Sequence, residues 1–264
     1  MTQTLARWLG VREPFDAIAR SAALTQLIAL ALPRRRTLRV LDLGTGTGSN
    51  VRYIAPQLGG EQRWTLVDKD PAVLARIDGN VDVPYDTVQI NLGACDRPDI
   101  FDGIDLVTAS ALLDLVSEPF LGWLAHRCRG AGALALFALT YTGRSTCTPA
   151  EPEDGYICEL LNRHQRQCDK GFGAAAGPGA VDAAERAFTA AGYRVERAES
   201  DWLLPPDAYD LQRELMQGWA DAALELQPAE STMIDDWLAR RVAHLDAGRS
   251  RIVVSHEDLA AFPS

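Results

Sequence analysis

Residues 40 to 50 read VLDLGTGTGSN, in which an apolar run meets three glycines at alternating positions. The run begins at Leu38, and a short Leu- and Val-rich segment bounded by turn residues predicts a buried parallel strand. Glycine at the exit of a strand lets the backbone turn tightly and approach a ligand without a Cβ in the way. Residues 50–58 predict a helix whose free N–H groups face that turn. The pattern therefore predicts a nucleotide-binding pocket.

The spacing of the glycines separates two families of nucleotide-binding proteins. The dinucleotide fingerprint is G-x-G-x-x-G, whereas here Ser49 follows Gly48, so the third glycine comes one residue early. The pattern D-x-G-x-G-x-G instead resembles motif I of the class I S-adenosylmethionine (SAM) dependent methyltransferases. The resemblance covers residues 38 to 200 and the last strand. It implies that Gly44–Gly48 pass under the methionine moiety of the cofactor and that Asp42 helps to hold its ammonium group.

The ends of the next strands extend this site. Residues 64–68, WTLVD, end in an acid, and a carboxylate at this place can accept hydrogen bonds from both ribose hydroxyls. By the resemblance, the residues just past the third strand recognise the adenine, with Asp96 as a further candidate. The predicted cofactor-binding residues are Asp42, Gly44, Thr45, Gly46, Gly48, Asn50, Asp68, Lys69, Asn91, Leu92 and Ser110.

Strand and helix patterns alternate along most of the chain, which favours a mostly parallel sheet covered by helices. The predicted strands are residues 38–43, 64–68, 87–91, 104–110, 133–141, 193–198 and 251–254. We expect an α/β, Rossmann-like, doubly wound sheet of these seven strands. The resemblance implies that the last strand is antiparallel and lies at the sheet edge. The pattern also predicts a helix over residues 13–32, and the resemblance implies that it covers the cofactor, with Arg12, Arg20 and Ser21 as candidates to face inward.

The expected organisation is an N-terminal helical cap, residues 1–36, followed by a SAM-binding domain, residues 37–264. Two insertions, residues 142–179 and 205–248, are expected to form a substrate cap, because long connections in compact domains are usually functional. The second predicts two helices, 208–226 and 231–245. The first carries a polar block, residues 162–173, that favours either a solvated helix face or a grip on a polar substrate. The substrate-binding candidates are Arg144, Asn162, Arg163, Asp169 and Lys170.

The resemblance implies methyl transfer, for which we expect a hydroxyl or amine of a small polar metabolite as the acceptor. A hydroxyl must lose a proton, and histidine is the usual base because its pKa lies near neutrality. His164 is the first candidate, since Asp169 and two arginines are near it in sequence. Asp114, at the mouth of the fourth strand, Tyr141 and His256 are the other candidates.

Composition limits the class of protein further. The chain has 264 residues and a net charge of −10, which argues against a nucleic-acid surface. Five scattered cysteines without ligand spacing predict a reducing cytoplasm and no metal site. The longest nearly uncharged run is too short to span a bilayer. We expect a cytoplasmic monomer or homodimer. The alternatives are an NAD(P)-dependent oxidoreductase and a SAM-binding sensor or partner protein without turnover.

Overall fold

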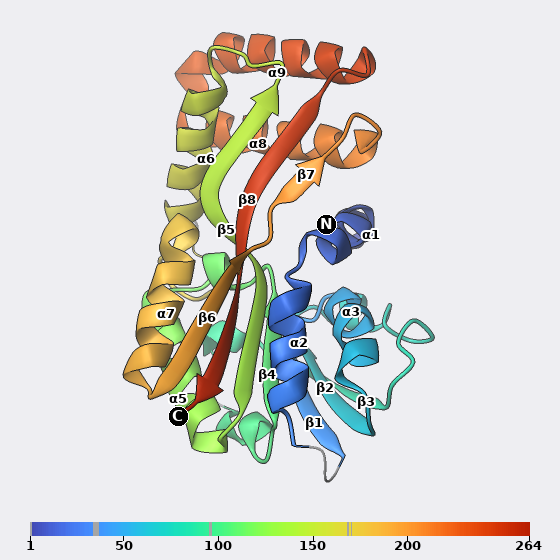
Figure 1. The fold of residues 1–264 in the computed structure, drawn as a ribbon. Helices are drawn as coiled ribbons and strands as arrows, with labels where there is room; N and C mark the ends of the chain where they lie inside the picture. Colours follow the sequence, from blue (N-terminus) through green and yellow to red (C-terminus); the bar gives the residue numbers. More distant parts are fainter. Residues whose placement is uncertain (1, 34–36, 95–96, 168, 170) are drawn as a thin grey trace.

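The computed structural model describes residues 2–33, 37–94, 97–167, 169 and 171–264. Its sheet has the strand order β3-β2-β1-β4-β5-β8-β6, and the short β7 pairs with β8 (Figure 1). β1 to β5 are parallel, and β8 is antiparallel to β5, β6 and β7. The predicted mostly parallel, doubly wound α/β sheet is therefore confirmed. The strands are β1 (Leu38–Leu43), β2 (Gln62–Asp68), β3 (Tyr85–Gln89), β4 (Leu106–Ser110), β5 (Leu134–Thr148), β6 (Tyr193–Glu199), β7 (Trp202–Leu204) and β8 (Arg251–Pro263).

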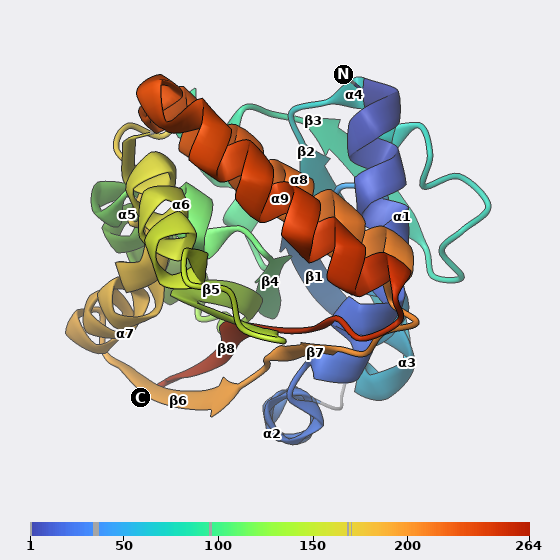
Figure 2. The same cartoon turned by 90° about the horizontal axis from the view of Figure 1, so that it is seen from above.

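Helices cover both faces of the sheet and its carboxyl end (Figures 1 and 2). α5 and α7 pack on one face, where Leu124, Phe137 and Phe188 are fully buried, and α2 and α3 pack on the other around Ile28 and Ile54. α8 and α9 lie across the top of the molecule. The helices are α1 (Thr2–Ala19), α2 (Ala22–Ala31), α3 (Ser49–Leu58), α4 (Pro71–Leu74), α5 (Glu118–Ala131), α6 (Asp154–Gln167), α7 (Ala180–Ala190), α8 (Tyr209–Leu226) and α9 (Ser231–Asp246).

The last strand is longer than expected and does not lie at the edge of the sheet. β8 runs between β5 and β6, and its second half contains Leu259, Ala260 and Ala261, which are buried. Small and apolar side chains at consecutive positions fit a strand that is covered on both faces. The prediction that this strand ends at Val254 and sits at the edge is wrong on both points.

The first insertion is also different from its prediction. β5 does not end at Tyr141 but continues to Thr148, because residues 145–148 pair with residues 251–254 of β8. A register shift lies between Phe137 and Thr140, and the buried carboxylate of Asp258 accepts the Leu139 amide there at 2.8 Å. The polar block therefore starts on α6, which follows this long strand, and not in a loop directly after Tyr141.

The expected N-terminal helix is two helices. Ser21 caps α2, and its side-chain oxygen accepts the Leu24 N–H at 3.2 Å. The backbone N–H of Ser21 donates to Asp258 at 2.8 Å, which ties the break to the sheet. A serine at this position is a strong N-cap signal. The break turns α1 toward the top of the sheet, where it contacts β7 and α8.

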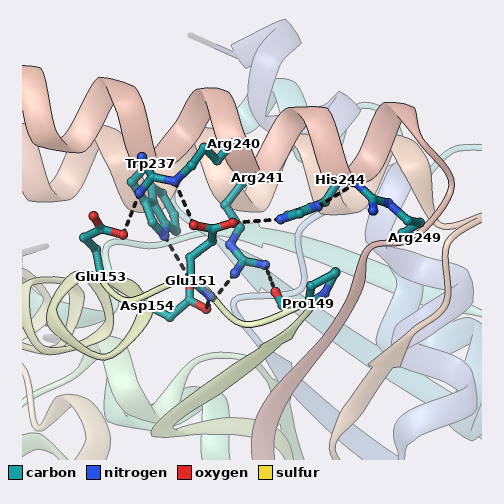
Figure 3. Close-up of polar contacts among 9 residues, drawn as sticks. All are labelled: Pro149, Glu151, Glu153, Asp154, Trp237, Arg240, Arg241, His244 and Arg249. Carbon is teal, nitrogen blue, oxygen red and sulfur yellow. Dashed lines mark hydrogen bonds and ion pairs between the residues drawn. The ribbon is translucent and has the colours of Figure 1, made fainter.

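α9 is attached to the segment that joins β5 to α6 by a group of charged residues (Figure 3). The fully buried Arg241 donates to the Pro149 carbonyl and to Asp154, each at 2.7 Å. The Trp237 indole N–H also donates to Asp154, at 2.8 Å. Glu151 accepts from Arg240 and contacts His244, so the contacts extend along two turns of α9.

Candidate functional site

A cavity of about 500 Å³ lies over the carboxyl ends of the parallel strands. It extends from the ends of β2 and β3, across β1 and β4, to β5 and β8. This is the crevice at which doubly wound sheets bind their ligands. The predicted residues that line it are Arg12, Gly44, Thr45, Gly46, Asn50, Asp68, Lys69, Asn91, Leu92, Ser110, Asp114, Tyr141 and His256.

The glycine-rich loop is shaped by backbone conformations that glycine adopts most readily. Gly44, Gly46 and Gly48 have φ values of 64°, 56° and 83°. A Cβ on Gly46 would come within 3.1 Å of Leu9 of α1. The Gly46 N–H donates to one oxygen of Asp68 at 2.9 Å, and the Asp70 N–H donates to the other at 3.0 Å. Asp68 thus fixes the loop while its carboxylate lines the cavity.

Two predicted residues support the loop from behind rather than lining the cavity. Gly48 is the N-cap of α3, and Asp42 is fully buried. Asn50 donates to Asp42 at 2.5 Å and to Thr108 at 3.1 Å, and it accepts from Arg20 at 2.5 Å. Burial raises the pKa of Asp42 to about 6, against hydrogen bonds that lower it. The row Arg20–Asn50–Asp42 therefore connects the end of α1 to β1.

Arg20 also faces a second cavity of about 280 Å³, which adjoins the first at Ser49, Asn50 and Ser110. Its guanidinium is buried and lies 4.3 Å from the centre of the Tyr53 ring. Nε and Nη2 have no hydrogen-bond partner among the described residues. A buried cation with unused donors beside a helix N-terminus is suited to an anionic ligand group.

The far end of the large cavity is built around β5 and β8. Tyr141 and His256 are direct partners across these strands, with ring centres 6.1 Å apart. Burial and the nearby guanidinium of Arg12 lower the pKa of His256 to about 3, so its ring is neutral at neutral pH. Burial raises the pKa of the Tyr141 hydroxyl, which keeps it protonated. Both groups are therefore neutral hydrogen-bonding groups.

A three-residue contact joins α1 to β7 at this end. Arg12 donates to Asp16 at 2.8 and 3.2 Å, and the Trp202 indole N–H donates to the same carboxylate at 3.0 Å. The Arg12 guanidinium lies 5.1 Å from the centre of the Trp202 ring. All three residues line the cavity. The charges of Arg12 and Asp16 in this part of the lining are therefore paired with each other.

The described substrate-binding candidates and His164 do not line the cavity, although Gln165 and Phe172 of the polar block do. His164 lies on α6 with Nε2 2.7 Å from Glu225 of α8, and Asn162 donates to the Gly143 carbonyl at 2.8 Å. Arg144 and Arg163 are exposed. Asp169 accepts three backbone N–H groups of the loop that follows it. Lys170 and Asp96 lie outside the described residues.

The sequence patterns did not predict many of the residues that line the cavity beside β5 and β8. These residues come from several elements. Leu161 and Gln165 of α6 line the cavity, whereas His164 on the same helix does not. The other residues missed include Leu5, Trp8 and Leu9 of α1, Leu139 of β5, Phe172, Trp202 of β7, and Leu215 and Trp219 of α8. The three tryptophans were the available signal, because large aromatic side chains are frequent in ligand pockets.

Among the described residues, no group of three or more His, Cys, Asp or Glu side chains could hold a metal ion. In the same described part of the chain, no helix is long and apolar enough to cross a membrane.

Comparison with known proteins agrees with the fold and the glycine-rich loop. Residues 40–132 match the family model described as a methyltransferase domain. A candidate methyltransferase from Bacillus halodurans C-125 shares the fold, with a TM-score of 0.51 and 14% identity over 92% of this chain and 100% of that chain. No curated protein sequence matches the chain.

Two further solved structures are similar, at lower TM-scores. A SAM-dependent methyltransferase from Geobacter sulfurreducens, in complex with S-adenosylhomocysteine (SAH), has a TM-score of 0.46 and 15% identity over 93% of this chain and 92% of that chain. Phosphoethanolamine N-methyltransferase 2 from Haemonchus contortus has a TM-score of 0.49 and 16% identity over 99% of this chain and 58% of that chain.

Residues 40–132 therefore match a methyltransferase domain, and the chain shares its fold with a candidate methyltransferase.

Proposed function

We propose that the chain transfers a methyl group from SAM to a hydroxyl or amine of a small molecule held under α1 and α8. The observation that carries the proposal is the single cavity that joins Asp68 to Tyr141 and His256. The cofactor occupies the half over β1, β2 and β3, and the acceptor occupies the half beside β5 and β8. A net charge of −10 supports a small acceptor over nucleic acid.

Asp68 is proposed to bind the ribose. Each of its oxygens accepts one backbone N–H in the structure. An ionised carboxylate oxygen has more than one lone pair, so each can still accept a hydroxyl proton of the ribose. Asn91 and Leu92 then lie beside the adenine, and the open backbone at Gly44 and Gly46 allows close approach of the cofactor.

The methionine end of the cofactor is proposed to lie at Asn50 and Arg20. The unpartnered Nε and Nη2 of Arg20 would bind the carboxylate, supported by the positive end of the α3 dipole. Asp42 supplies negative charge behind Asn50 for the ammonium group, with one oxygen that has no partner among the described residues. The unpartnered nitrogens of Arg20 and the unpartnered oxygen of Asp42 thus suit the carboxylate and the ammonium group of an amino acid.

SAM supplies an electrophilic methyl group on a sulfonium, which is displaced in line by the acceptor. The protein must align the acceptor and exclude water. Tyr141 and His256 are the neutral groups placed to hold the acceptor hydroxyl or amine, and the buried Asp114 lines the same cavity. His164 lies outside the lining and has no part in this proposal. Residues 205–248 form the cover of the acceptor half.

The proposal is tested by isothermal titration calorimetry with SAM and, separately, SAH. We expect binding, and we expect Asp68→Ala to weaken it more than tenfold, a loss of about 1.4 kcal/mol or more. Asp86→Ala is the matched control, because Asp86 is an exposed acid on the neighbouring β3. Stabilisation by NAD(P) together with no binding of SAH would instead support the oxidoreductase alternative.

A further inference from the structure

The acceptor half of the cavity has an aromatic wall, which we define as Trp8, Tyr141, Trp202 and Trp219. The four rings come from α1, β5, β7 and α8 and so surround the space from several sides. Trp8 packs edge-on against Trp202, with ring centres 6.3 Å apart and planes at 65°. The gaps between the rings are filled by aliphatic side chains, Leu139, Leu161, Leu215 and Val254. Such a wall favours a ligand with a flat apolar body.

Two of the charges at this end, those of Arg12 and Asp16, are paired with each other, and the buried Asp114 also lines the cavity. Arg12 and Asp16 form a two-bond ion pair, and the Trp202 indole N–H takes a further position on the carboxylate. A charged acceptor would lose its hydration here without gaining a free counter-ion from this pair, which is costly in a buried site. An acceptor without net charge avoids that cost.

Two of the polar groups that remain, His256 and Tyr141, are suited to one hydroxyl. Nδ1 of His256 is buried and has no hydrogen-bond partner among the described residues. His256 lies across from Tyr141 in the strand register and 5.0 Å, centre to centre, from the Trp202 ring. A hydroxyl on a flat ligand packed against these rings can donate to the imidazole and accept from the tyrosine.

We propose that the acceptor is an uncharged planar aromatic compound and that it is methylated on a phenolic hydroxyl. This inference rests on the methyl transfer proposed above and names its substrate class. The phenolic oxygen bonds to the methyl carbon as the carbon–sulfur bond breaks. The electron pair of that bond turns the sulfonium into the neutral thioether of SAH. The hydroxyl proton passes to Nδ1 of His256, which returns it to solvent after the products leave.

The phenol is preferred to an aliphatic alcohol for a chemical reason. A neutral histidine in a dry, apolar site is a weak base, because burial disfavours its charged form. Only a fairly acidic hydroxyl can lose its proton to such a base during the transfer. Phenols, like the tyrosine side chain, have pKa values of about 10, far below that of water at about 15.7.

The experiment compares four ligands of one size by calorimetric titration of the SAH-bound protein. They are 2-naphthol, its saturated counterpart decahydro-2-naphthol, the anion 2-naphthoate and the cation of 2-(aminomethyl)naphthalene. We expect 2-naphthol to bind at least tenfold more tightly than each of the others. With SAM in place of SAH, we expect 2-naphthol to gain one methyl group on oxygen, measured by mass spectrometry.

Equal binding of 2-naphthol and its saturated counterpart would overturn the proposal, as would a preference for either charged ligand or no binding of any of the four. The SAH titration that precedes each experiment separates this failure from that of the proposed function. If SAH binds and 2-naphthol is not preferred, only the substrate class is wrong.

Two variants assign the preference to the aromatic wall. Trp219→Leu keeps an apolar side chain but removes the ring, so we expect at least a tenfold loss of the preference for 2-naphthol with unchanged affinity for SAH. Leu203→Ala is the matched control, because Leu203 lies next to Trp202 on β7 but is 71% exposed. It should change neither affinity. A Trp219→Leu protein that keeps the full preference would contradict the role of the wall.

Discussion

Arg20 shows how a single buried residue can link an N-terminal helix to the cofactor loop. It donates to Asn50, which holds Asp42, and two of its nitrogens have no partner among the described residues. Burial lowers the pKa of its guanidinium, and the nearby carboxylates of Asp258, Asp42 and Asp16 oppose this shift. The group therefore stays charged in a place where an anionic ligand group can use its free donors.

We predict that Arg20→Met weakens SAH binding tenfold or more, about 1.4 kcal/mol, because the methionine carboxylate loses its charged partner. Calorimetric titration measures the affinity, and circular dichroism checks that the variant is folded. Arg63→Met serves as the control, since Arg63 is an exposed arginine on β2. Unchanged SAH affinity in a folded Arg20→Met protein would show that the carboxylate of SAH does not bind to Arg20.

The lowered pKa of His256 makes the free energy of unfolding depend on pH. Its pKa is lowered from 6.5 to about 3 in the folded protein, so the unfolded chain binds this proton first as the pH falls. The stability that the neutral ring contributes is present above pH 6.5 and is lost progressively as the pH falls toward 3. The slope is at most about 1.4 kcal/mol per pH unit.

We therefore predict that His256→Gln, which has no such proton to bind, loses less stability than the wild-type protein between pH 7 and pH 5. Urea unfolding at the two pH values measures the difference. Asp42 and the other acids titrate in both proteins, so their contribution cancels in the comparison. Parallel loss of stability in the two proteins would show that the imidazole is not held neutral.

At the scale of elements, α9 is held to the β5–α6 connection by a buried ion pair (Figure 3). The side chain of Arg241 is fully buried and that of Asp154 is 18% exposed. Removing one member of such a pair leaves an uncompensated charge, which usually costs about 3–5 kcal/mol, whereas replacing both by apolar residues is often close to neutral.

We predict that Asp154→Leu lowers the free energy of unfolding by about 3–5 kcal/mol and that Arg241→Met in the same chain recovers most of it. Glu118→Gln is the control, because its ion pair with Arg186 is exposed on both sides and should contribute less than about 1 kcal/mol. Denaturant unfolding of the four proteins measures these values. A small effect of Asp154→Leu alone would mean that water reaches Arg241.

At the scale of the whole molecule, the sequence predicted the parts of the site that are local. The loop at Gly44–Gly48 and the acid at Asp68 belong to short continuous patterns, and the structure places both at one cavity. The break at Ser21 also had a local signal, a serine followed by a new apolar run, which a single long apolar pattern concealed.

The far wall could not be predicted in this way because long-range pairing creates it. Tyr141 meets His256 only because β8 lies beside β5, and Trp202 joins them through β7. The polar block around His164 looked chemically active in sequence. The continuation of β5 to Thr148 and the packing of α6 against α8 instead place His164 outside the lining of the cavity.

The central claim is that one cavity holds the cofactor over β1 to β3 and the acceptor beside β5 and β8. A crystal structure of the protein with SAH tests it most directly. We expect the adenine beside Asn91 and Leu92, the ribose hydroxyls on Asp68, and the sulfur directed toward Tyr141 and His256. Density for the adenine within the aromatic wall, or a sulfur directed away from His256, would contradict the account.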